Sequence, residues 1–195
     1  MVFYSADFTK GRNGRNAVLV DEKGETVLKL RGSGGVLDER GKLAWYVQPS
    51  VRNLFAAAIS GGQNGEPAVD LHRSRRVANG GKPTWATVEH PRIDEFVVKL
   101  HDPGTPDVTF GLLTTGEPGD PAAEGQPTAN SELLVNGEVA ARHWPTPGDD
   151  WRLTGSRYEV LDDTLGLPEI LLLCNARYEL WRPHHDPRTF QWIRQ

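Results

Sequence analysis

The sharpest local charge feature of the sequence is the segment His72–Arg76, in which three arginines lie close together. Guanidinium groups bind phosphate bidentately, so Arg73, Arg75 and Arg76 are the predicted ligand-binding residues, for a phosphoinositide headgroup or a nucleic-acid backbone. The segment Lys10–Arg15 would add to this site if the two segments meet in space. The alternative is a solvated strand end without a ligand.

A second group with chemical potential is the segment His184–Asp186, which holds two histidines and an aspartate in consecutive positions. Imidazole and carboxylate groups are common metal ligands and general acids or bases. Adjacent histidines on an extended segment point to opposite sides, so both would bind one ion only in a tight turn. The segment supports one hypothesis, a metal-dependent enzyme, against the alternative of an exposed polar loop after a helix.

Other signals for catalysis are weak. Cys174 would act as a nucleophile only if a base and a cationic environment lowered its pKa, and its leucine-rich neighbours favour a buried structural thiol. The sequence contains no serine-hydrolase elbow, no phosphate-binding loop followed by a lysine, and no paired-cysteine metal spacing. The segment Gly32–Gly35 lies between two predicted hairpins, so it is a turn and not a nucleotide fingerprint.

The composition narrows the class of protein. The chain has 195 residues, enough for one domain that buries about 70 % of the surface of its unfolded form. A net charge of −4 opposes a nucleic-acid partner, and the single cysteine forbids an intramolecular disulfide. The segment up to Asn16 lacks the apolar stretch of a signal peptide or anchor, and no transmembrane segment is predicted, so we expect a cytoplasmic location.

The elements that must position these residues are mostly strands. Two hairpins with the same turn chemistry are predicted near the N-terminus, and each turn carries an aspartate, two charged residues and a glycine. Their strand pairs are Ala17–Val20 with Thr26–Leu30, and Val36–Leu37 with Leu43–Val47. Two such turns indicate consecutive hairpins of a meander.

Further strands follow along the chain. They are Ala68–His72, Trp85–Val88, Phe96–Leu100, Val108–Leu113, Trp151–Val160, Thr189–Ile193 and the hairpin Glu132–Val135 with Glu138–Ala141. The apolar run Val51–Ile59 fits a helix or a strand, and the glycine pairs after it favour a strand. The segment Gly116–Asn130 is rich in glycine and proline and is predicted to be the most mobile loop.

One helix is predicted over Leu167–Arg182, in the only long apolar run of the chain. Asp162–Thr164 supplies acids and a capping hydroxyl at its start, Pro168 fits a first turn, and Pro183 lacks the N–H needed to continue. Apolar residues are distributed around the whole helix, which would be about 24 Å long. We therefore expect it to be surrounded by protein.

These elements predict a mainly β, single domain over residues 1–195, with about ten to twelve antiparallel strands. A long meander must protect its two edges, and closure into a barrel removes them. A barrel of this size has a lumen too wide for side chains alone, which the apolar helix would fill. The alternative is a two-sheet sandwich with the helix packed across one end.

The segments Asp21–Leu28 and Leu37–Leu43 are similar to hairpins in which LURP-one-like chains place an acid, a turn glycine and a returning apolar strand. Tyr158–Val160 before the helix fits the same order. On these residues the chain resembles the tubby C-terminal-like superfamily, which includes LURP-one-related proteins and phospholipid scramblases. The resemblance implies a closed barrel around a C-terminal helix and a phospholipid headgroup site. Without a transmembrane tail or an acidic calcium loop, it does not imply lipid scrambling.

Three functional hypotheses follow. The first is a non-enzymatic, tubby-like binding or scaffold domain for a phospholipid headgroup or another anionic ligand, with no cofactor. The second is a subunit or interaction protein of a larger assembly, with Gly116–Asn130 as the contact to a protein partner. The third is a metal-dependent enzyme that uses His184–Asp186.

Overall fold

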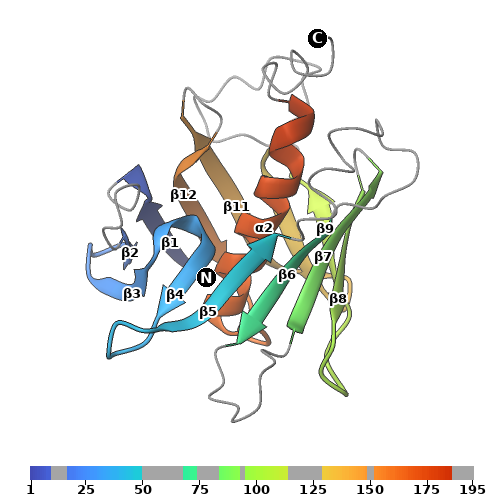
Figure 1. Cartoon of the computed structure of the whole chain (residues 1–195), viewed down its shortest axis with the longest axis horizontal. Coiled ribbons are helices and arrows are strands. Elements are labelled where there is room, and N and C mark those ends of the chain that lie inside the picture. The colour runs from blue at the N-terminus through green and yellow to red at the C-terminus, as the bar shows by residue number, and fades with distance from the viewer. Residues whose placement is uncertain are drawn as a thin grey trace.

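The computed structural model describes residues 1–9, 17–49, 68–73, 84–92, 95–113, 129–148 and 152–185. Over these residues the protein is mainly β, with twelve strands and one α-helix. The strands are β1 (Val2–Asp7), β2 (Ala17–Asp21), β3 (Thr26–Leu30), β4 (Gly35–Leu37), β5 (Leu43–Pro49), β6 (Ala68–Arg73), β7 (Thr84–Arg92), β8 (Glu95–Leu100), β9 (Val108–Leu112), β10 (Ser131–Val135), β11 (Glu138–Pro147) and β12 (Leu153–Val160). A short 3-10 turn, η2 (Gly32–Gly34), separates β3 from β4, and α2 (Leu167–His185) follows β12 (Figure 1).

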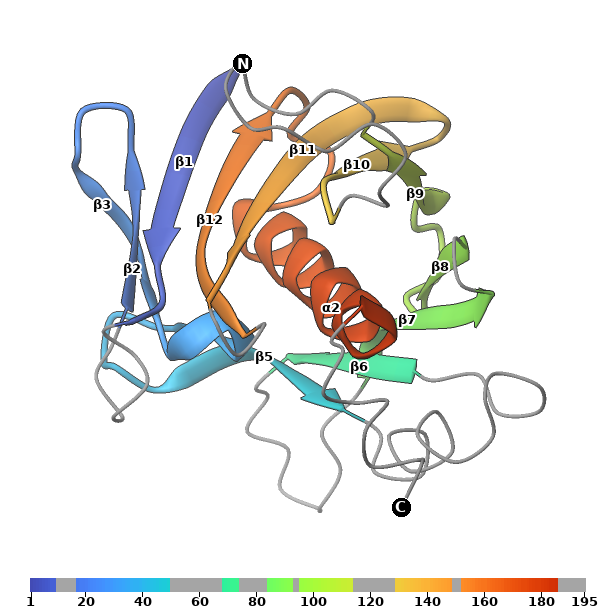
Figure 2. The same cartoon turned by 90° about the horizontal axis from the view of Figure 1, so that it is seen from above.

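The twelve strands form a closed antiparallel barrel in which each strand pairs with its neighbours in the chain. The ring is completed by β1, which pairs with β2 on one side and with β12 on the other. Seen from above, the strands surround α2 (Figure 2). The structure therefore confirms the predicted meander closed around a C-terminal helix and not the alternative of a two-sheet sandwich.

The two N-terminal hairpins have the same turn, as the sequence predicts. The Asp21 carboxylate accepts hydrogen bonds from the backbone N–H groups of Lys23 and Glu25, both at 2.9 Å. Asp38 repeats this arrangement in the second turn. Each turn then needs a residue with positive φ, which Gly24 provides at φ 80° and Gly41 at φ 73°. A carboxylate and a glycine at this spacing thus determine where each strand reverses.

The helix α2 occupies the lumen of the barrel. It contacts β5, β6 and β7 on one side and β10, β11 and β12 on another (Figure 2). Every residue from Ile170 to Tyr178 is buried, including the polar Asn175 and Arg177. The helix is therefore enclosed on all sides over more than two turns, and it fills a lumen that the barrel side chains could not fill alone.

Polar contacts fix the rotation of α2 within this apolar core. The hydroxyl of Tyr158, on β12, donates a hydrogen bond to Oδ1 of Asn175 at 2.6 Å. Nδ2 of Asn175 donates to the backbone carbonyl of Ser33 at 2.9 Å. One helix residue is thereby connected both to the barrel wall and to η2, which gives the helix a specific orientation that leucine packing does not define.

Two elements differ from the sequence-based prediction. The strand β1 is not among the predicted strands, which begin at Ala17, and yet it closes the barrel. The helix α2 continues to His185 and does not stop before Pro183. A proline removes its own N–H and crowds the preceding turn, but its φ is compatible with a helix, so one further turn can follow at a helix end.

Several predicted elements lie outside the described residues. They are the strands at Val51–Ile59 and Thr189–Ile193 and the greater part of the loop Gly116–Asn130. The last two residues of that loop are described, and they belong to the barrel: Asn130 is buried, and Ala129 packs against the core. The mobility predicted for this loop stays a prediction.

Candidate functional site

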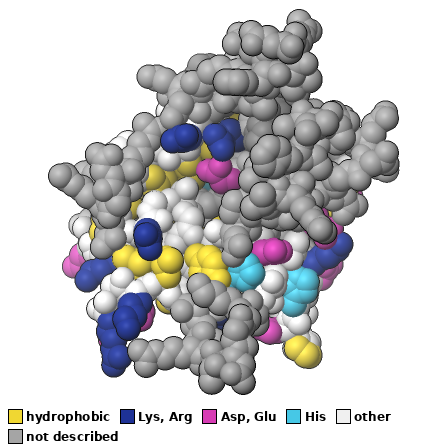
Figure 3. All heavy atoms as spheres, in the orientation of Figure 1, with side chains coloured by type: hydrophobic (Ala, Val, Ile, Leu, Met, Phe, Trp, Pro, Cys, Tyr) yellow, Lys and Arg dark blue, Asp and Glu magenta, His cyan; other side chains and the backbone are white. Residues whose placement is uncertain are grey.

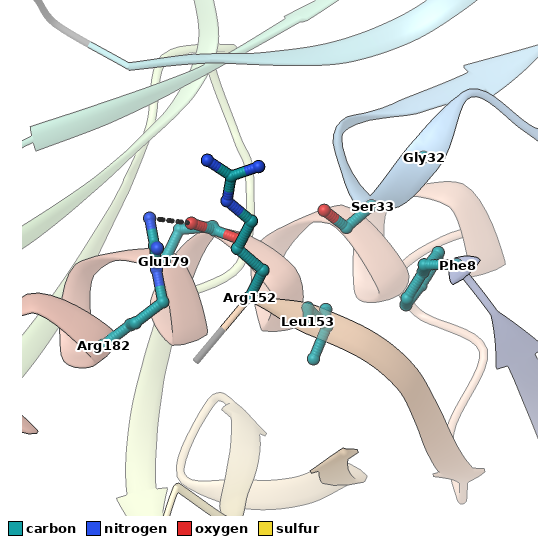
Figure 4. Close-up of a pocket in the computed structure, with 7 residues that line it drawn as sticks. All are labelled: Phe8, Gly32, Ser33, Arg152, Leu153, Glu179 and Arg182. Carbon is teal, nitrogen blue, oxygen red and sulfur yellow. Dashed lines mark ion pairs between the residues drawn. The ribbon is translucent and has the colours of Figure 1, made fainter. Parts of the chain in front are cut away.

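One end of the barrel carries a cleft, which we call the mouth cleft, with a volume of about 210 Å³ (Figure 4). Four separate parts of the chain line it: the residue after β1, the turn η2, the start of β12 and the second half of α2. The lining residues are Phe8, Gly32, Ser33, Arg152, Leu153, Glu179 and Arg182.

The walls of the mouth cleft are fixed by the fold. Phe8 and Leu153, of which only 3 % and 6 % of the surface is exposed to solvent, provide an apolar base. Phe8 donates its backbone N–H to the carbonyl of Thr154 at 2.8 Å, which connects the end of β1 to β12. The η2 wall is held by the hydrogen bond from Asn175 to the carbonyl of Ser33. A ligand would therefore meet a preformed apolar base with polar groups above it.

The charged groups of the mouth cleft are two arginines and one glutamate. Arg182 forms an ion pair with Glu179 at 3.1 Å, one turn apart on α2. The guanidinium of Arg152 extends over the cleft between Glu179 and Ser33, in the view of Figure 4. Two of the described lining residues are thus arginines, and guanidinium groups favour phosphate and carboxylate ligands. The arrangement is suited to binding an anion.

Of the predicted ligand-binding residues, the structure describes Arg73 and places it at the opposite end of the barrel. Its guanidinium lies 3.7 Å from Asp102 and 3.6 Å from Glu169, the acid in the first turn of α2. It also lies 4.5 Å from the ring centre of Trp45. These contacts give Arg73 a structural role, since they tie the start of the helix to the barrel wall.

Ligand binding by the whole predicted cluster remains a prediction, because Arg75 and Arg76 lie outside the described residues, as does the segment 10–15. Glu169 and Glu179 are separated by ten residues of α2, or about 15 Å along the helix. Arg73 and the mouth cleft therefore lie at opposite ends of the barrel.

Sequence patterns did not single out Arg152 as a site residue. Arg152 is a single basic residue that follows Asp149 and Asp150 closely, so it forms no basic cluster in the sequence. Arg182 is a typical residue for the end of a helix. Their common position follows from the pairing of β1 with β12 and from the placement of α2 in the lumen. Only tertiary structure brings them together.

The interior of the barrel contains titratable groups that burial keeps uncharged. Burial raises the pKa of the Cys174 thiol to about 12, with the charge of Arg177 acting in the opposite direction. Burial, with a further contribution from Arg177, lowers the pKa of His143 to about 3. At neutral pH the thiol is protonated and the imidazole is neutral, so Cys174 behaves as the predicted structural thiol and not as a nucleophile.

The hypothesis of a metal site is not tested by the structure. His184 and His185 are the last two residues of α2 and not part of a loop after it, and Asp186 lies outside the described residues. Among the residues that are described, no three histidine, cysteine, aspartate or glutamate side chains come close enough to share a metal ion. The described part of the chain also contains no helix with the length and apolar character needed to span a membrane.

On the face of the molecule shown in Figure 3, basic and acidic side chains of the described residues are interspersed. Such a surface favours a local site for an anion over a broad area of one charge. Comparisons of the chain with models of protein families, with curated proteins and with solved structures found no match. A function is therefore inferred from the fold and from the mouth cleft.

Proposed function

We propose that this protein is a non-enzymatic, tubby-like binding domain that holds an anionic ligand, a phospholipid headgroup, in the mouth cleft. The observation that carries the proposal is the approach of Arg152 and Arg182 to one cleft from two different elements. A phosphate group would accept hydrogen bonds from both guanidinium groups, each of them stronger than a bond between neutral partners.

The architecture supports the tubby-like part of the proposal. The resemblance of the hairpins implies a closed barrel around a C-terminal apolar helix, and this chain has twelve strands in a closed ring around α2. A fold by itself does not define a function, so the ligand is argued from the cleft. Its apolar base at Phe8 and Leu153 suits the carbon atoms that accompany a headgroup phosphate.

Binding to vesicles tests the proposal. We expect the protein to sediment with phosphatidylcholine vesicles that contain a phosphatidylinositol bisphosphate and not with phosphatidylcholine alone. The double variant Arg152→Gln and Arg182→Gln should bind at least about tenfold more weakly, because each lost charge-assisted hydrogen bond contributes roughly 1.5–3 kcal/mol. Titration with the soluble inositol phosphate by calorimetry separates recognition of the headgroup from recognition of the membrane surface.

Two further variants make the result specific. Lys29→Gln changes an exposed charge on the outer surface of β3 and should bind as the wild type does. Arg75→Gln with Arg76→Gln tests the cluster predicted from the sequence. If that variant loses binding and the Arg152 and Arg182 variant does not, the ligand binds at the arginine cluster and the proposal for the mouth cleft is wrong.

Three other expectations from the sequence remain predictions. They are the contact to a larger assembly through Gly116–Asn130, the metal-dependent enzyme that uses His184–Asp186, and the cytoplasmic location. Mass measurement in solution with and without residues 116–128 tests the first, since a monomer in both cases speaks against assembly. Metal analysis of protein purified without a histidine tag tests the second, and bound metal far below one equivalent would exclude it.

A further inference from the structure

Among the buried side-chain atoms of the described residues that lack a hydrogen-bond partner, three belong to residues that meet in the barrel interior. They are Oγ of Ser131, Nδ1 of His143 and Nε of Arg177. Ser131 and His143 are fully buried, and Arg177 is 1 % exposed. A buried polar group without a partner costs about 1–3 kcal/mol, and more if it is charged, so three of them in one region require an explanation.

These atoms belong to one region of the lumen. Ser131 on β10 stands directly opposite His143 on β11 in the sheet register, and both side chains are buried on the inner side of the barrel. Directly opposed residues have Cβ atoms about 4.5–5.5 Å apart. Arg177 reaches the same place from the helix, because its Nη1 donates a hydrogen bond to the carbonyl of Ala129, two residues before Ser131.

The charge of Arg177 is not neutralised by the described part of the protein. Its guanidinium lies 4.6 Å from the ring centre of Phe96, and among described residues no carboxylate forms an ion pair with it. Burial lowers its pKa to about 10, which leaves it protonated at neutral pH. An isolated charge in a protein interior is strongly unfavourable unless it has a partner of opposite sign.

All three atoms can act as donors. Nε of arginine always carries a hydrogen, and the Ser131 hydroxyl can rotate its hydrogen toward an acceptor. Nε2 of His143 lies 2.9 Å from Oγ of Ser156, and if Ser156 donates in this bond, the imidazole hydrogen is on Nδ1. The ring is held in this orientation by stacking on Tyr158, with ring centres 4.8 Å apart. Three N–H or O–H groups in this region are then without an acceptor among the described residues.

We propose that Ser131, His143 and Arg177 form a binding site inside the barrel for a small monovalent anion the size of chloride. An anion accepts hydrogen bonds from all three donors and neutralises the guanidinium. A buried water molecule would meet the same donors but would leave the charge uncompensated. This site is separate from the mouth cleft and does not depend on the function proposed for it.

Thermal unfolding at constant ionic strength tests the proposal, with chloride replaced stepwise by gluconate, which is too large for such a site. A ligand that binds only the folded state raises the melting temperature, here by roughly 3–6 °C for each tenfold increase in chloride above its Kd. Arg177→Met should abolish this dependence, whatever its own melting temperature. Arg40→Met, which removes an exposed arginine from the turn between β4 and β5, away from the lumen and from the mouth cleft, should retain it.

A second variant covers the case in which Arg177→Met does not fold. Ser131→Ala removes one donor and keeps the charge, so the chloride dependence should shift to roughly tenfold higher concentrations. Crystals grown in bromide should show an anomalous peak between Ser131, His143 and Arg177. The proposal would be overturned if chloride did not change the melting temperature of the wild type, or if Ser131→Ala kept the chloride dependence of the wild type. It would also be overturned if the crystals showed a water molecule or a carboxylate of the chain at this position.

Discussion

At the scale of single residues, the polar groups of the lumen define the helix position more specifically than its leucines do. Asn175 is buried and uses both ends of its amide, one toward Tyr158 and the other toward Ser33. Apolar packing tolerates small rotations of a helix, whereas a buried amide loses its partners when the helix turns. These contacts also hold the η2 wall of the mouth cleft.

Replacement of Tyr158 by phenylalanine should therefore destabilise the protein without changing its fold. The change removes one hydroxyl and leaves Oδ1 of Asn175 buried without its partner, at a cost of about 1–3 kcal/mol. Urea unfolding measures this loss. Ser5→Ala, at an exposed position on β1, is the control. A loss below about 0.5 kcal/mol would show that the bond does not hold the helix.

His143 should make stability depend on pH. Its folded-state pKa is about 3, below the ordinary value of 6.5, because burial and the charge of Arg177 disfavour the protonated ring. As the pH falls, the unfolded chain takes up this proton before the folded protein does. The contribution of His143 to the free energy of unfolding is therefore complete above pH 6.5 and is lost between pH 6.5 and 3.

The variant His143→Phe isolates this effect, because it keeps an aromatic ring beside Tyr158 and cannot be protonated. Between pH 6.5 and 3 the free energy of unfolding of the wild type should fall more steeply than that of the variant, by up to about 1.4 kcal/mol per pH unit. Urea unfolding across this range gives both slopes. Parallel curves would mean that His143 is protonated in the folded protein or is not enclosed.

At the scale of elements, the helix α2 is the part on which the architecture depends. Leu171, Leu172, Leu173 and Cys174 point in four directions about 100° apart, and each is at most 1 % exposed. Aspartate at any of the four positions would bury a carboxylate without a partner, at a cost of several kcal/mol. We expect four unfolded or insoluble proteins, and Leu172→Ala should lose about 2–5 kcal/mol.

Solubility and the melting temperature of each variant provide the measurement. An aspartate variant that is soluble with a melting temperature near that of the wild type would reveal an exposed face of the helix. The control is Glu179→Asp, which should fold because this position is already acidic and only half-buried.

Local signals account for the elements that the sequence predicts well. The hairpin turns at Asp21 and Asp38 carry their own geometry, since a carboxylate and a glycine determine the reversal wherever they stand. The apolar pattern of α2 likewise shows that no side of it can face water. Such elements can be predicted because their causes are close together in sequence.

The elements that the sequence does not predict have causes far away in the chain. The strand β1 has only Val2, Phe3 and Tyr4 as β-forming residues and obtains its position from β2 and β12. The mouth cleft combines residues as distant as Phe8 and Arg182, which no spacing rule connects. The ion pairs of Arg73 with Asp102 and Glu169 are likewise not visible in the local sequence, and ligand binding by the predicted arginine cluster stays a prediction.

At the scale of the whole molecule, closure of the barrel leaves neither edge of the meander exposed. The pairing of β1 with β12 makes this closure. Proline at Ala6, a buried residue paired with Ser156 on one side and Leu19 on the other, should prevent closure, because the ring removes a donor inside the sheet. We expect a loss of stability, because a ladder hydrogen bond is removed, with aggregation through the open edges.

The matched control is Glu39→Pro, in the second position of the turn that begins at Asp38, where proline is favoured. Circular dichroism and size-exclusion chromatography compare the two variants. A monomeric Ala6→Pro protein as stable as the wild type would contradict the role of β1 in closure.

The most direct test of the central claim, an anion site at the mouth cleft, is the chemical-shift change of backbone amides during titration with a soluble inositol phosphate. We predict saturable changes at Gly32, Ser33, Arg152 and Leu153, with little change at Arg73 and Trp45 at the other end of the barrel. Changes confined to the Arg73 end, or changes that do not saturate at any residue, would contradict it.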